Sequence, residues 1–171
     1  MELMPILEAY AALEKQGIEF YQTLGRRFPD AKGSRLWAEL ANTEASHQAI
    51  LMLAMDWTHT WSGPKSEPPV EMGDLDAAIQ TAGDLLAEAS RPDLPLARAV
   101  ELAVAWEEQE LPRILAIAPY CPGRGQGQLL AMVAEAAGHY DELAQLARAA
   151  GQEALIPRIE ALRATADATV R

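Results

Sequence analysis

Apolar residues recur three or four positions apart along most of the chain, which is the spacing of amphipathic helices. Ala and Leu are abundant, and runs of β-branched residues are absent. The pattern predicts four long helices, over residues 5–27, 34–57, 96–118 and 126–150. Pro5 suits the first turn of a helix, and Gly151 is a typical stop signal after one.

The connections between these helices differ in length. The segment "THTWSGPKSEPPVEMGD" (58–74) is rich in Pro, Gly and Ser and leads into an accessory helix, "DLDAAIQTAGDLLAEAS", for which Asp74 is the expected N-cap. A short last helix is expected over 153–168. The chain therefore reads as one all-α domain, residues 1–171, with two helical hairpins joined by a long crossover. That connectivity is typical of a ferritin-like four-helix bundle.

Ionisable residues interrupt each apolar face near the middle of its helix. They are Glu14 on the first long helix, Glu44 and His47 on the second, Glu107 and Glu110 on the third, and His139 on the fourth. A buried charge is costly unless it is paired or coordinated, so several at one level need a shared partner. A pair of metal cations fits, because iron and manganese accept carboxylate together with imidazole; zinc is a further possibility.

The di-metal template of such bundles takes one Glu from each of two helices and Glu-x-x-His from each of the other two. Glu14 and Glu107 fill the single-Glu places, and the segment 44–47 supplies one Glu-x-x-His. On the fourth helix, His139 is present but Ala136 stands where the second Glu is expected. Glu135 is one position early, about 100° round the helix, and would reach the site from its flank. Glu110 on the third long helix is an alternative source of the missing carboxylate.

Two stretches, "ALEKQGIEFYQTLG" and "LWAELANTEASHQAIL", resemble the rubrerythrin-like branch of the ferritin-like superfamily. Members of that branch have an inward Glu seven residues before a Tyr, and Glu14 and Tyr21 have this spacing in the first stretch. The motif LA-x-x-E-x-x-H spans residues 40–47, and Glu107 and Glu110 have the Glu-x-x-Glu spacing of that branch.

The resemblance implies a non-haem di-iron site that reacts with peroxide or dioxygen. Rubrerythrins also carry a rubredoxin domain that binds iron through several cysteines, whereas this chain has only Cys121. Electrons would therefore come from an external donor. Ala136 removes one carboxylate from the second iron position.

Composition narrows the choice of partners. Half of the residues are hydrophobic, the net charge is −11 and the pI is about 4.7. An acidic chain is a poor match for nucleic acid, whose phosphates require a basic patch. One cysteine, no basic segment before an apolar one at the start, and no long apolar run lead us to expect a cytoplasmic protein without a membrane partner.

Two functions remain open at this stage. The first is a di-iron oxidoreductase that reduces peroxide or oxidises ferrous iron. The alternative is a degenerate bundle that binds one metal or none and serves as a structural or protein-interaction module, for which Ala136 is the reason. Apolar residues left over on the accessory and last helices suggest a homodimer in either case.

Overall fold

A computed structural model describes residues 2–29, 33–63 and 67–169, and this part of the chain contains helices and no strands. The expected all-α class is therefore confirmed. Residues 64–66 of the expected long connection lie outside the described residues. The helices are α1 (Leu3–Arg27), α2 (Ser34–Thr60), α3 (Met72–Ala89), α4 (Leu96–Ile117), α5 (Gly125–Ala149) and α6 (Ile156–Thr169), with short 3-10 turns η1 (Ala118–Tyr120) and η2 (Glu153–Leu155).

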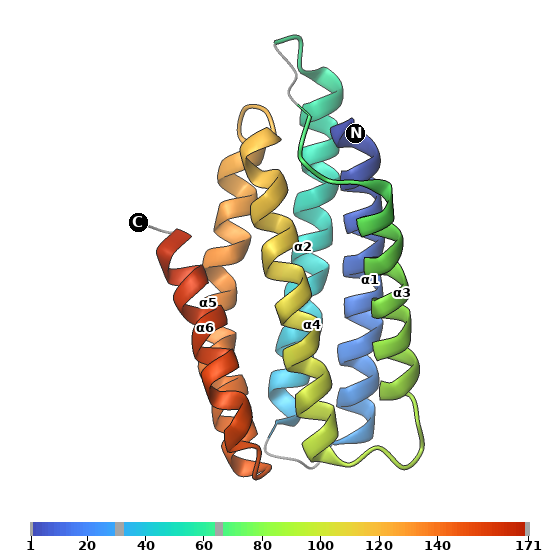
Figure 1. The fold of residues 1–171 in the computed structure, drawn as a ribbon, viewed down its shortest axis with the longest axis vertical. Coiled ribbons are helices and arrows are strands. Elements are labelled where there is room, and N and C mark those ends of the chain that lie inside the picture. The colour runs from blue at the N-terminus through green and yellow to red at the C-terminus, as the bar shows by residue number, and fades with distance from the viewer. Residues whose placement is uncertain (1, 30–32, 64–66, 170–171) are drawn as a thin grey trace.

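The long helices lie side by side as two antiparallel hairpins, α1 with α2 and α4 with α5 (Figure 1). Helix α3 packs along α1 and carries the chain from the end of α2 back to the opposite end of the bundle, where α4 begins. As a result, α4 runs parallel to α2. Helix α6 packs mainly against α5 at one side of the bundle.

The start of α3 differs from the expectation. Asp74 is not the N-cap: the helix begins at Met72, with Glu71 in the N-cap position and Asp74 at the third helical position. The backbone N–H of Glu71 donates to Asp74 Oδ2 at 3.3 Å, one half of a capping box. The carboxylate thus stabilises the helix start from inside the first turn, a position that the residue type alone does not distinguish from the N-cap.

Large aromatic side chains fill the bundle around its middle. Phe20 stacks on Trp106 with ring centroids 5.0 Å apart, and Tyr21 lies 6.3 Å from Trp37. Burying a side chain of this size stabilises the fold by roughly 1.5–3 kcal/mol. These rigid neighbours hold the polar residues of the interior in place. None of the helices in the described ranges has a stretch long and apolar enough to cross a bilayer.

Candidate metal centre

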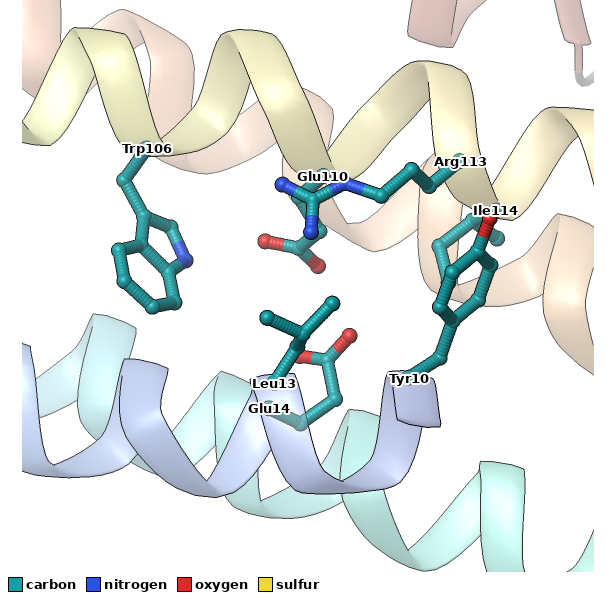
Figure 2. A pocket seen from close by; sticks show the side chains of 7 residues that line it. All are labelled: Tyr10, Leu13, Glu14, Trp106, Glu110, Arg113 and Ile114. Atoms are coloured by element: carbon teal, nitrogen blue, oxygen red, sulfur yellow. The ribbon is translucent and has the colours of Figure 1, made fainter. Parts of the chain in front are cut away.

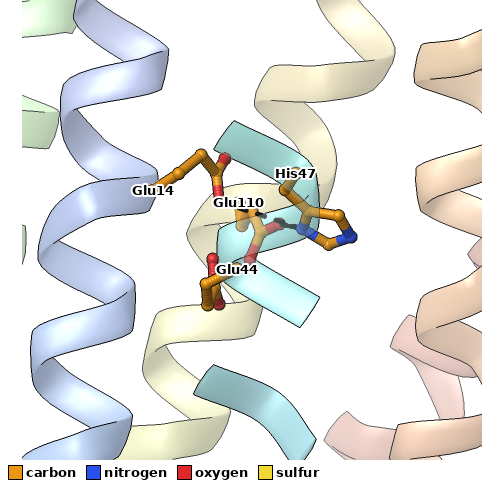
Figure 3. A group of neighbouring side chains, drawn as sticks. All are labelled: Glu14, Glu44, His47 and Glu110. Atoms are coloured by element: carbon orange, nitrogen blue, oxygen red, sulfur yellow. Dashed lines mark hydrogen bonds and ion pairs between the residues drawn. The ribbon is translucent and has the colours of Figure 1, made fainter. Parts of the chain in front are cut away.

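Four side chains from three helices converge in the interior of the bundle. They are Glu14 from α1, Glu44 and His47 from α2, and Glu110 from α4 (Figure 3). Each offers one ligand atom, and these atoms all lie within 4.8 Å of one another. Glu14, Glu44 and His47 are 2–3% exposed, and the Glu110 side chain is 13% exposed.

Helical spacing explains why these residues meet. Glu44 and His47 are three positions apart on α2, so they project from the same face. Room for the Glu44 carboxylate comes from Gly17 on α1. A Cβ atom at position 17 would lie 2.8 Å from the carboxyl carbon of Glu44 and 2.9 Å from the Trp106 ring. The glycine therefore lets the carboxylate lie directly against the backbone of α1.

One hydrogen bond joins the imidazole to a carboxylate. His47 Nδ1 lies 2.8 Å from Glu110 Oε1 and 3.8 Å from Glu14 Oε2. Nδ1 is therefore the ring nitrogen that faces the carboxylates, whereas Nε2 points away from them (Figure 3). A metal ion held by the carboxylates would bind the lone pair of Nδ1 in place of the proton shared with Glu110.

Several buried atoms of the cluster lack a hydrogen-bond partner among the residues described. They are Glu14 Oε2, Glu44 Oε2 and His47 Nε2. Buried polar atoms are nearly always bonded, because an unpaired one costs about 1–3 kcal/mol. Glu14 Oε2 and Glu44 Oε2 are two unpaired electron-pair donors in one cluster, and a cation would satisfy both, whereas His47 Nε2 points away from the carboxylates (Figure 3). The residues present thus fit a metal ion, and a donor set of carboxylates and one imidazole suits iron, manganese or zinc.

The pKa shifts of the metal-free cluster also favour the binding of a cation. Burial, followed by the charge of Glu110, raises the pKa of Glu14 to about 7 and that of Glu44 well above its usual range. Burial alone would lower the pKa of His47, but Glu110 and Glu14 outweigh it and raise that pKa to about 9. The pKa of Glu110 is lowered, since the charge and hydrogen bond of His47 overcome the effect of its burial. Without a metal, protons neutralise the site, and a bound cation would displace them.

Glu107 lies beside this group with its own partners. Its Oε1 accepts a hydrogen bond of 2.5 Å from the Tyr21 hydroxyl, and Tyr140 of α5 also bonds to its carboxyl group. Burial and the nearby Glu110 raise the pKa of Glu107 to about 8, although both phenols oppose this. As a metal ligand Glu107 remains a prediction; its carboxyl group is not among the four that converge.

The structure does not bring the expected α5 residues into the group. Glu135 is exposed, and His139 is half-buried with Nε2 3.4 Å from Thr43 Oγ1. Helix α5 instead turns Ala136 and Tyr140 inward, four residues apart. Glu135 and His139 each precede an inward residue by one position, so both lie about 100° round the helix.

A small cavity lies beside Ala136, at the position where the template has its second Glu-x-x-His carboxylate. His47 and Glu110 line it on one side, and Met132, Val133 and Ala136 form an apolar wall on the other. Tyr140 is one helical turn beyond Ala136, so helical periodicity could have identified it as an inward residue. The sequence instead led to the prediction that its neighbour His139 faces the site.

A second small cavity opens on the other side of the cluster, between α1 and α4 (Figure 2). Glu14 and Glu110 lie at its base, and Tyr10, Trp106 and Arg113 are among the residues around it. It has room for about one water molecule. We did not expect Arg113 here from the sequence, although its place three residues after Glu110 puts both on one face of α4.

We found no matching protein-family model, curated protein or solved structure. The case for a function therefore rests on the site itself.

Proposed function

We propose that this chain is a ferritin-like, rubrerythrin-type metalloprotein that binds iron and acts as an oxidoreductase on peroxide, dioxygen or ferrous iron. The observation that carries the proposal is the convergence of three carboxylates and one imidazole, with unpaired buried donor atoms, in the middle of a helical bundle. The two-hairpin arrangement with a crossover helix supports the ferritin-like assignment.

Each residue has a separate task in this proposal. Glu14, Glu44 and Glu110 supply oxygen ligands, and His47 supplies Nδ1, the ring nitrogen that faces Glu110 and Glu14. Glu107 holds a proton next to the site, between two phenols. Iron bound there would supply electrons one at a time to the oxidant. A soluble donor would return them, since Cys121 cannot form a cysteine-rich iron site on its own.

The converging donors are sufficient for one ion. The second ion implied by the resemblance would have to draw on Glu107 and on α5, which presents Ala136. Manganese or zinc are the other metals that the donor set accepts.

The test is iron content per chain after anaerobic loading with ferrous iron and removal of unbound metal. We expect the unaltered protein to retain iron and Glu44→Gln to lose it. Asp56→Asn changes an exposed acid on the same helix and is the matched control. Equal iron in Glu44→Gln and the unaltered protein would reject the site; no iron in the unaltered protein would reject the function.

One observation favours the alternative, a bundle that has lost catalysis and serves as a protein-interaction module. It is the apolar wall that α5 presents to the cluster. Peroxide-dependent oxidation of the loaded protein separates the two functions, because only the oxidoreductase turns over.

The large exposed apolar side chains include Met52 and Leu53 on α2 and Met72 and Ile79 on α3, so a homodimer would use these helices rather than α6.

A further inference from the structure

Arg113 places a positive charge beside the candidate metal centre. It lies one helical turn beyond Glu110 on α4, and its guanidinium group extends into the cavity that Glu14 and Glu110 also line (Figure 2). The group is held by its own helix: Nε donates to the carbonyl oxygen of Gln109 at 2.5 Å, and Nη2 lies 3.4 Å from Gln109 Oε1.

The positive charge of Arg113 interacts with the carboxylates of the cluster. Among the charged groups that act on it, Glu110 is the strongest, and Glu14 and Glu44 also contribute. Burial lowers the pKa of Arg113, but a guanidinium remains protonated under any physiological condition. In the described part of the chain no carboxylate lies within ion-pairing distance of it, so its charge is not cancelled by a separate partner.

The charge of Arg113 changes how many divalent cations are needed to neutralise the site. The ionised carboxylates of Glu14, Glu44, Glu107 and Glu110 would carry four negative charges, which two divalent cations would balance. With Arg113 present, two divalent cations would leave a buried excess of positive charge. One divalent cation and the guanidinium leave one negative charge, which a proton on Glu107 removes.

We propose that Arg113 takes the place of a second metal cation, so that the centre holds one divalent ion per chain. The inference rests on the proposed function, because it presupposes that the centre binds metal. It assigns Arg113 as a positioning residue that sets metal stoichiometry through its charge and not through contact with the ion.

The test is a calorimetric titration of the metal-free protein with Zn²⁺, accompanied by elemental analysis after desalting. Zinc is chosen because it has no redox chemistry. Three proteins are compared: unaltered, Arg113→Met, which keeps an apolar side chain of similar length, and Arg113→Lys, which keeps the charge. Arg124→Met removes an exposed arginine and is the control for net charge.

We expect one Zn²⁺ per chain in the unaltered protein, Arg113→Lys and Arg124→Met. In Arg113→Met we expect a second ion to bind, or the first to bind at least tenfold more tightly. Two ions in the unaltered protein would overturn the inference and leave the proposed function standing, whatever the variants do. Unchanged stoichiometry and affinity in a helical Arg113→Met would also overturn it. No zinc in the unaltered protein would overturn both proposals.

Discussion

The two sides of the buried cluster are built differently. On the side of α1, α2 and α4, carboxylates and an imidazole face one another, and several of their atoms have no partner. On the side of α5, Ala136, Met132 and Val133 present methyl and methylene groups. The only polar group that α5 turns inward among the residues described there is the Tyr140 hydroxyl, which is bonded to Glu107.

This difference shows that the cluster is asymmetric in charge as well as in shape. A symmetric di-metal centre requires ligands from both hairpins in equal number. Here the first hairpin supplies Glu14, Glu44 and His47, whereas the second supplies Glu110 from α4 and no metal-binding side chain from the inner face of α5. The charged side can hold a cation without help from α5.

Placing a carboxylate on the apolar side is the strongest way to break the asymmetry. In Ala136→Glu, the new side chain points into the cavity beside His47. Without metal, this variant should lose about 3 kcal/mol or more of unfolding free energy, because an additional acid is buried without a partner. With Zn²⁺ it should recover part of that stability and bind one ion more than the unaltered protein. Urea unfolding with and without zinc measures both effects; equal stability of the metal-free proteins would contradict the assignment of this wall as buried.

The charged side should make the metal-free protein sensitive to pH. Folding raises the pKa of Glu14 to about 7, of Glu107 to about 8 and of His47 to about 9, so the folded state binds more protons than the unfolded state. The free energy of unfolding should therefore be greatest near pH 5 and fall by several kcal/mol by pH 8, since each unit of raised pKa contributes about 1.4 kcal/mol. Glu110 does not reverse this, since its lowered pKa acts only below pH 5.

Urea unfolding at a series of pH values measures this slope. The metal-loaded protein is the control: a bound cation takes over the neutralisation of the acids, so its stability should not fall over the same range. A metal-free protein that grows more stable from pH 5 to pH 8 would show that these acids are not buried together.

The close approach of α1 to Glu44 should be visible in a glycine substitution. Ala at a helical glycine normally stabilises by up to about 1 kcal/mol. Gly17→Ala should instead be neutral or destabilising and should weaken Zn²⁺ binding by about tenfold, because its Cβ would displace the Glu44 carboxylate. Gly138→Ala on α5, where a Cβ meets nothing within 4 Å, is the matched control and should stabilise. Similar stability and Zn²⁺ affinity in the two variants would show that Glu44 does not depend on the space left by Gly17.

The smallest effect is expected from Glu135, the acid on α5 that stands one position before the place where the template has a Glu. Glu135 is exposed, so Glu135→Gln should change Zn²⁺ affinity by less than about twofold. Calorimetric titration is sufficient for this comparison. A loss of tenfold or more would mean that α5 rotates toward the cluster when metal binds.

The same two sides show how far the sequence could predict the site. The positions of Glu14, Glu44 and His47 follow from helical periodicity, because each interrupts an apolar face near its middle. On α5, small residues surround the inward positions, so the apolar face is broad and its centre is poorly defined from the pattern. His139 consequently looked inward although Ala136 and Tyr140 are the residues that face the cluster.

Contacts between helices were beyond the reach of the pattern. Arg113 has a long side chain, and whether it extends to solvent or into the bundle depends on the neighbouring helix. The space that Gly17 leaves for Glu44 likewise depends on how closely α1 and α2 pack. Periodicity assigns a residue to a face of its own helix, and it does not give the distance to the next one.

The most direct test of the central claim is to locate the metal. Crystals grown with Zn²⁺ or Fe²⁺ and measured at the absorption edge of that metal give an anomalous peak at each bound ion. We predict one strong peak per chain, between the side chains of Glu14, Glu44, His47 and Glu110. The absence of a peak there, or a peak bound only by surface carboxylates, would contradict the account.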